Sequence, residues 1–154
     1  MQVLKASRSK LRRGDVFALQ PRGRRYLFGR IVDTETIIGP MTDCLLIYVY
    51  RVQSEVKELP AAAELMPVNL LLPPMMTNRL PWSRGYFETI GHQEIDPGMT
   101  LDVHCFRGPD GRFYDEKSHE LPGPVEPVGV HALKSHRTID DAVSKALGIP
   151  RAPD

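Results

Sequence analysis

The sequence predicts a mainly β fold of the α+β class: a bent antiparallel sheet or small barrel with a C-terminal helix and room for one short helix in mid-chain. Short runs in which apolar and polar residues alternate, separated by glycine and proline turn signals, recur between residues 14 and 115. A helical pattern with clear start and stop signals occurs only near the C-terminus. The length suits a single domain over 1–154, with residues 1–9 frayed or in a short leading strand and 149–154 as a tail.

The N-terminal third carries the strongest local pattern, and residues 10–33 are expected to form a β-hairpin. Alternation with period two precedes residue 20 and resumes at residue 26, as in half-buried strands. Between the two runs, Pro21 presets φ for a turn and Gly23 tolerates positive φ. Gly29, inside the second strand, predicts a bulge or a close approach of another backbone.

The hairpin also carries a family resemblance. The segments GDVFAL (residues 14–19) and YLFGRIV (26–32), on either side of an arginine-rich turn, resemble the opening of the immunity protein 26 family of bacterial polymorphic toxin systems. Residues 70–74 and 80–87 follow the same layout more loosely. The resemblance implies a mostly β protein that neutralises a toxin encoded beside it by binding, with no catalytic residue and no cofactor. The family-motif positions, expected to be structural, are Gly14, Asp15, Phe28 and Gly29.

The middle of the chain predicts one buried strand followed by short elements. Residues 44–50, CLLIYVY, form a β-branched and aromatic run typical of a central strand covered on both faces. Residues 52–66 are ambiguous, because a short helix there would be interrupted by Pro60. Further along, we expect a strand at 68–72, a loop at 75–84 and a strand at 86–90.

The C-terminal part predicts a second hairpin and a helix. The hairpin comprises a strand at 101–106, a turn at 108–111 and a return at 112–115, and a proline-rich connection at 119–127 follows. For the helix, Thr138 is the expected N-cap with Asp141 at capping-box spacing, and Gly148 with Pro150 ends it. Its apolar face is expected to contain Ile139, Val143, Ala146 and Leu147.

Composition indicates an ordinary soluble protein, with 42% hydrophobic and 25% charged residues. The longest apolar run, 44–50, is far shorter than the roughly 20 residues of a membrane span. No apolar stretch follows the basic N-terminal residues, so no signal peptide is predicted and a cytoplasmic location is expected. Cys44 and Cys105 lie in apolar runs, where free, buried and unreactive thiols are usual.

The titratable residues give no catalytic or metal-binding signature. The five histidines are scattered, and no CxxC or HxxxH spacing occurs. Alternation places Asp102 and His104 on one face of a strand and Cys105 on the other, so the three do not form one ligand set. We therefore predict a non-enzyme without metal or cofactor. The least favoured class is an enzyme with a dispersed site that joins Asp102, His104 and Asp115.

Basic residues are concentrated at the N-terminus, although the formal net charge is only +1. Nine of them oppose a single acid, Asp15, in the first thirty residues: Lys5, Arg8, Lys10, Arg12, Arg13, Arg22, Arg24, Arg25 and Arg30. The arginines of the turn have three interpretations, namely a solvated turn, a phosphate contact with Tyr26 available for stacking, or anchors for a protein partner.

A second candidate surface is the segment WSRGYF, residues 82–87. Its tryptophan either fills the edge of the core or is exposed for binding, and the sequence leaves both open. Partner binding is assigned to a set of arginines and aromatic residues: Arg22, Arg24, Arg25, Trp82, Arg84 and Tyr86.

The first functional hypothesis is an immunity protein that binds and occludes a cognate toxin domain, often a nuclease by the family resemblance. A mimic of nucleic acid would be acidic, so this chain is expected to bind outside a nuclease active site or to meet an acidic surface. The alternative is a small β-barrel module that binds nucleic acid through the basic hairpin.

Overall fold

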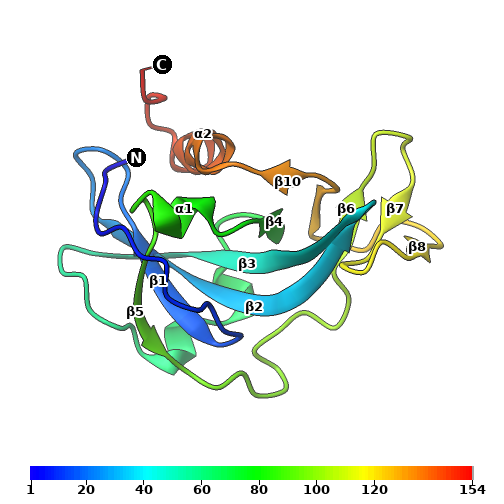
Figure 1. Ribbon diagram of the computed structural model, residues 1–154, viewed down its shortest axis with the longest axis horizontal. Helices are drawn as coiled ribbons and strands as arrows, with labels where there is room; N and C mark the ends of the chain where they lie inside the picture. The colour runs from blue at the N-terminus through cyan, green and yellow to red at the C-terminus, as the bar shows by residue number, and fades with distance from the viewer. Residues whose placement is uncertain (154) are drawn as a thin grey trace.

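The computed structural model, which describes residues 1–153, consists of two β-sheets and a C-terminal helix (Figure 1). The larger sheet has the order β10-β4-β3-β2-β1-β5, and the smaller has the order β8-β7-β6-β9. All neighbours are antiparallel except the pairs β4–β10 and β6–β9, which are parallel. The prediction of a mainly β fold with a bent sheet and a C-terminal helix is therefore confirmed, with a second small sheet added.

The larger sheet is built on three consecutive strands, β1 (Asp15–Leu19), β2 (Tyr26–Ile38) and β3 (Met41–Ser54). β1 and β2 form the predicted hairpin, in which Val16 is opposite Arg30. β2 and β3 form a longer hairpin whose register shifts at several bulges. Because bulges increase the local bend and twist of a strand, both long strands are curved along their length (Figure 1).

Gly29 is the point of closest packing in this sheet. A Cβ atom at this position would lie 2.3 Å from Cζ of Phe17 and 2.6 Å from the carbonyl oxygen of Tyr48. The ring of Phe17, on the neighbouring strand, therefore occupies the space that a side chain would need. A register shift in the β2–β3 pairing also occurs between Leu27 and Gly29. The predicted close backbone approach is confirmed.

Both faces of β3 are buried, as residues 44–50 predict. All seven residues of this stretch are buried, and they alternate between two cores. The helix-side core consists of Phe17, Leu19, Leu27, Ile31, Leu45, Ile47, Val49, Leu72, Met75, Trp82, Phe87, Ile139 and Val143. The opposite core consists of Val16, Ala18, Phe28, Val32, Ile38, Cys44, Leu46, Tyr48, Tyr50, Leu65, Met76 and Phe106. Cys44 and Cys105 are free and buried, and burial raises the pKa of the Cys44 thiol.

An aromatic cluster fills the helix-side core. Trp82, on the short helix α1 (Leu80–Ser83), is only 1% exposed and meets the rings of Phe17 and Phe87 edge-on at 5.0 Å. Phe17 and Phe87 stack at 4.6 Å. The sequence left open whether Trp82 fills the core or is exposed for binding, and the structure shows that it fills the core. α1 lies where we predicted a loop.

The segment after β3, which the sequence leaves ambiguous, contains no α-helix. β3 runs on to Ser54 because it pairs with the start of β2 at Tyr26, so no helix begins there. The prolines of the following segment limit regular structure to two 3-10 turns, η1 (Ala62–Glu64) and η2 (Pro67–Asn69). The strand predicted at 68–72 is wrong, since only a single bridge joins Leu70 to β3.

The later strands are shorter than predicted. β4 (Met75–Thr77) occupies part of the predicted loop because it pairs with the buried centre of β3. β5 (Glu88–His92) begins two residues after the predicted strand. The predicted second hairpin is confirmed, but β6 (Cys105–Arg107) is short. The strands that complete the two sheets are β7 (Phe113–Tyr114), β8 (Glu120–Leu121), β9 (Val128–Val130) and β10 (Leu133–Lys134).

The terminal helix α2 (His136–Leu147) starts three residues before the position predicted by Thr138. Ser135 is the N-cap, because its hydroxyl accepts a hydrogen bond from the Thr138 amide at 3.2 Å. Its C-terminal end at Gly148, with φ of 67°, is confirmed. Ile139 and Val143 are buried as predicted, Leu147 is partly buried, and Ala146 is exposed.

Residues 1–9 form no strand, but backbone hydrogen bonds fix them to the rest of the chain. The amides of Gln2, Leu4 and Ser7 donate to the carbonyls of Gln20, Gly85 and Trp82. The segment therefore crosses the end of the helix-side core (Figure 1). Within residues 1–153, no helix has the length and hydropathy needed to cross a membrane.

We predict that Gly29→Ala lowers the free energy of unfolding by about 3 kcal/mol, since a Cβ there overlaps Phe17 and a buried carbonyl. Gly123→Ala is the matched control, because a Cβ at Gly123 meets nothing within 4 Å, and it should change stability by less than about 0.5 kcal/mol. Urea denaturation measures both. Equal stabilities for the two variants would contradict the packing described for β2.

Candidate partner-binding face

The turn between β1 and β2 is closed by hydrogen bonds and carries three exposed arginines. Pro21 is buried, and its carbonyl accepts a hydrogen bond from the Arg24 amide at 3.0 Å. The Gln20 side-chain amide donates to the Arg24 carbonyl at 2.8 Å, which closes the turn from the other side. The side chains of Arg22, Arg24 and Arg25 are left exposed on the outside of this turn.

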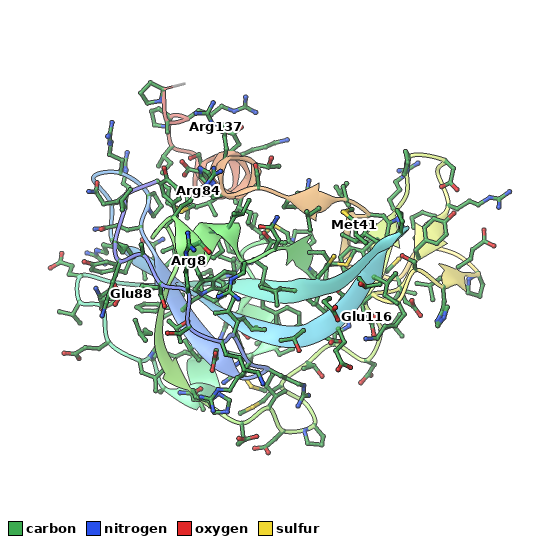
Figure 2. All side chains as sticks on the ribbon, viewed as in Figure 1. Arg8, Met41, Arg84, Glu88, Glu116 and Arg137 are labelled. Carbon is green, nitrogen blue, oxygen red and sulfur yellow. The ribbon has the colours of Figure 1, made fainter. Side chains whose placement is uncertain are left out.

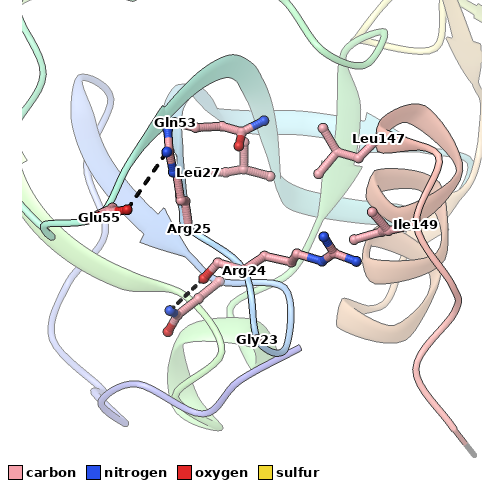
Figure 3. Close-up of a pocket in the computed structure, with 9 residues that line it drawn as sticks. Gly23, Arg24, Arg25, Leu27, Gln53, Glu55, Leu147 and Ile149 are labelled. Atoms are coloured by element: carbon pink, nitrogen blue, oxygen red, sulfur yellow. Dashed lines mark hydrogen bonds and ion pairs between the residues drawn. The ribbon is translucent and has the colours of Figure 1, made fainter.

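A cavity of about 560 Å³ separates this turn from the C-terminal end of α2 (Figure 3). Leu27, Leu147 and Ile149 supply its apolar lining, and Arg24 and Arg25 line it from the turn. Figure 3 shows the guanidinium of Arg24 extending toward Ile149. The cavity thus combines an apolar surface with positive charge, and its size is within the range of ordinary ligand pockets.

The charges of this cavity are only partly balanced. Arg25 lies 3.7 Å from Glu55, but the two side chains are 60% and 80% exposed. An ion pair in so much solvent contributes little, between about 0 and 1 kcal/mol. Arg24 makes no ion pair with any carboxylate of the described residues. Both guanidinium groups are therefore available to an acidic partner.

A second, smaller hollow lies on the other side of the turn, at the start of α2. Arg22, Tyr86 and His136 are among the residues that line this cavity of about 150 Å³. The rings of Tyr86 and His136 stack at 4.1 Å with 11° between their planes. Burial lowers the pKa of His136, and the positive charges of Arg84 and Arg137 lower it further. The stacked pair therefore lies among cations, with Asp140 and Asp141 in the same hollow.

Five of the six residues assigned to partner binding thus border one face, formed by the β1–β2 turn, residues 84–86 and α2. We call it the arginine face and define it by Arg22, Arg24, Arg25, Arg84 and Tyr86. In the view of Figure 2, Arg84 and Arg137 lie close to α2. The sixth residue, Trp82, is in the core and supports the segment that carries Arg84.

The contribution of α2 to this face was not predicted. His136, Arg137, Leu147 and Ile149 border the same hollows as the arginine turn. The helical pattern gives the face of α2 that packs on the core, but the turn is more than a hundred residues away along the chain. The packing of Ile139 and Val143 in the helix-side core, together with the ion pair between Asp140 and the Met1 amino group, brings the two segments together.

A buried polar network lies on the opposite side of the larger sheet. The Tyr48 hydroxyl is 2.6 Å from Nε2 of His104 and accepts a hydrogen bond from the Leu101 amide at 3.0 Å. Burial raises the pKa of Tyr48 to about 12, so the phenol stays protonated and can donate to His104. Glu116 faces the other ring nitrogen at 3.5 Å, and its hydrogen bond to His104 lowers the pKa of Glu116.

The residues of the least favoured enzyme hypothesis are not gathered in a cavity. Asp102 is exposed, whereas His104 is buried against Tyr48. One oxygen of Asp115 accepts hydrogen bonds from the amides of Lys117 and His119, as in a turn. Across residues 1–153, no group of three or more histidine, cysteine or acidic side chains is arranged to hold a metal ion.

The family-motif positions at the start of β1 have structural contacts. Asp15 is buried, accepts a hydrogen bond from the Arg12 amide and lies 2.9 Å from Nδ1 of His92. Glu94 lies 3.1 Å from the other nitrogen of His92. A Cβ at Gly14 would be 2.7 Å from the Gln93 carbonyl. This corner thus joins β1 to the end of β5, while Phe28 packs in the opposite core.

Comparison with known proteins gives one family match. A family model described as Immunity protein 26 matches residues 12–106. The matched range contains β1 to β5, residues 22–25 and residues 84–86, and it ends within β6, before α2. No curated protein and no solved structure matches the chain significantly.

We predict a pH-dependent contribution of His92 to stability. Its hydrogen bonds to Asp15 and Glu94 raise the pKa of His92, so the protonated ring stabilises the folded state. This contribution is complete below the unfolded pKa of about 6.5 and is lost as pH rises through the folded pKa. Thermal unfolding of His92→Gln should therefore show a larger loss of Tm at pH 5.5 than at pH 8.5. A loss that grows with pH would contradict this assignment.

Proposed function

The chain belongs to the immunity protein 26 family, and from that premise we propose that it neutralises a cognate toxin by binding and occluding it, without catalysing a reaction. The proposed complex is one-to-one and cytoplasmic. The observation that supports this proposal most strongly is the arginine face, where four exposed arginines and the half-buried Tyr86, from separate parts of the chain, border hollows beside α2.

The composition of the arginine face suits a protein interface. Arginine and tyrosine are among the residues that dominate the binding energy of interfaces, particularly where a partner excludes water from them. Leu147 and Ile149, both half-buried, add apolar surface next to Arg24. A stable complex buries about 1,600 Å² in total, so the partner would cover the β1–β2 turn, residues 84–86 and the outer side of α2 together.

The charge of the face indicates an acidic partner surface. Its five defining residues include four arginines, and Arg137 adds a fifth nearby. Of the acids close by, Asp140 already pairs with the Met1 amino group at 2.5 Å, Asp141 lies 3.9 Å from Arg151, and Glu55 is the weak partner of Arg25. A positive face speeds and orients association with a negative one. The toxin surface bound here would be acidic, and in a nuclease it would lie outside the substrate cleft.

The same arginines also favour a second candidate, a module that binds nucleic acid. The Tyr86–His136 stack beside Arg22 offers an aromatic surface next to cations, a combination that single strands bind. This candidate predicts an affinity that falls linearly with salt on a logarithmic scale. A toxin complex that combines apolar contacts with charges depends less steeply on salt.

The proposal predicts that Arg24→Glu and Arg84→Glu each weaken binding to the toxin encoded beside this chain by at least about tenfold, or 1.4 kcal/mol. The matched control is Arg112→Glu, an exposed turn arginine of the smaller sheet, 67% exposed beside Glu120. Titration calorimetry with a catalytically inactive toxin measures the three affinities. Equal weakening by all three variants would contradict a specific contact, and binding of a DNA oligonucleotide but not toxin would favour the second candidate.

A further inference from the structure

The strand β5 ends the larger sheet without a neighbour on its outer side. In the sheet order β5 follows β1 at the edge, and no other strand of residues 1–153 pairs with it. The register between β1 and β5 shifts at Val16/Phe17, which leaves Ile90 without a cross-strand partner. An edge strand presents a row of unpaired backbone N–H and C=O groups that another chain can pair with. At five residues, β5 is of ordinary strand length.

A groove of about 440 Å³ runs beside this strand. Thr89, Gly91 and His92 of β5 line it on one side, and residues 5–12 line it on the other. The N-terminal segment is held at both ends of the groove. The Ser7 amide donates to the Trp82 carbonyl at 3.0 Å, and the Gly14 carbonyl accepts from the Gln93 amide at 2.9 Å. The groove is therefore a fixed feature between two anchored segments.

The groove carries uncompensated positive charge. Its two acids are already paired, Glu88 with Lys57 at 2.8 Å and Asp15 with His92 at 2.9 Å. Lys5 and Lys10 line the groove, are exposed, and form no ion pair with any described carboxylate. Lys5 and Lys10 thus line the groove across from Thr89, Gly91 and His92 of β5.

We propose that the β5 edge and this groove bind an extended acidic segment of a partner protein, which adds to the larger sheet as a further strand. Backbone hydrogen bonds to β5 would give affinity, and alternate side chains of the added strand would give specificity. Acidic side chains on the groove side would meet Lys5 and Lys10. The charge and the open edge each restrict the partner, since a basic segment meets like charge and a helix offers no free backbone groups.

The groove adjoins the arginine face. The Leu4 amide donates to the Gly85 carbonyl at 2.7 Å, so the N-terminal segment passes directly from residues 84–86 to the groove. In the view of Figure 2, Arg8 lies between Arg84 and Glu88. One partner can therefore contact both surfaces. That the partner is a toxin rests on the proposed function, whereas the chemistry of the bound segment does not.

Nuclear magnetic resonance of the full-length ¹⁵N-labelled chain tests this inference with two blocked peptides at millimolar concentration. The probe has the sequence Glu-Val-Glu-Val-Glu, and Lys-Val-Lys-Val-Lys is its control. We expect the acidic peptide to shift the amide signals of β5 and to slow the hydrogen exchange of its free amides, and the basic peptide to do neither. Lys10→Glu should weaken binding of the acidic peptide by at least about tenfold, or 1.4 kcal/mol. Lys145 is an exposed lysine of α2, and Lys145→Glu should leave the affinity for this peptide unchanged.

Three results would overturn the inference: no shift in β5 with the acidic peptide, shifts confined to the arginine face, or shifts of β5 produced by a short oligothymidylate instead. These results do not decide the proposed function, which is tested by binding to the toxin. A chain that binds its toxin but not the acidic peptide would keep the proposed function and lose this docking site. A chain that binds the peptide along β5 but no toxin would do the reverse.

Discussion

The absence of a side chain at Gly29 is the constraint on which the sheet depends. Because position 29 has no Cβ, the ring of Phe17 lies against the backbone of Gly29 in β2. From there Phe17 stacks on Phe87 and meets Trp82 edge-on, which draws α1 and the start of β5 onto the same core. One close contact thus couples Phe17 of the N-terminal hairpin to aromatic residues that follow it by more than sixty residues.

The arginine face is a consequence of that core. Trp82 lies in the core and is followed at once by Arg84 and Tyr86, while Ile139 and Val143 bring α2 onto the same core. Tyr86 can stack on His136 because the helix-side core holds both residues 84–86 and α2 in place. The backbone segments that carry the positive side chains are therefore held in relative position, although the side chains themselves are exposed. Segments that are already placed lose less entropy on binding than flexible segments would.

Features that depend on local chemistry were predictable from the sequence, and features that depend on distant pairing were not. The turn at Pro21 and Gly23, the strand 44–50 and the end of α2 at Gly148 follow from neighbouring residues. The helix start was misplaced because Ser135 and Thr138 are both good caps and only tertiary packing selects between them. β4 was missed because its pairing with β3 decides its structure. Residues of the arginine face could be named, but the part contributed by α2 could not.

The central claim is that the chain binds a toxin through the arginine face, and hydrogen exchange tests it most directly. Amide exchange would be followed by mass spectrometry for the chain alone and in complex with an inactive variant of the proposed cognate toxin. We expect new protection in residues 20–25, residues 84–86 and α2, and none in the hairpin of β6 and β7. Protection confined to that hairpin, with residues 20–25 and α2 exchanging as in the free chain, would contradict the claim.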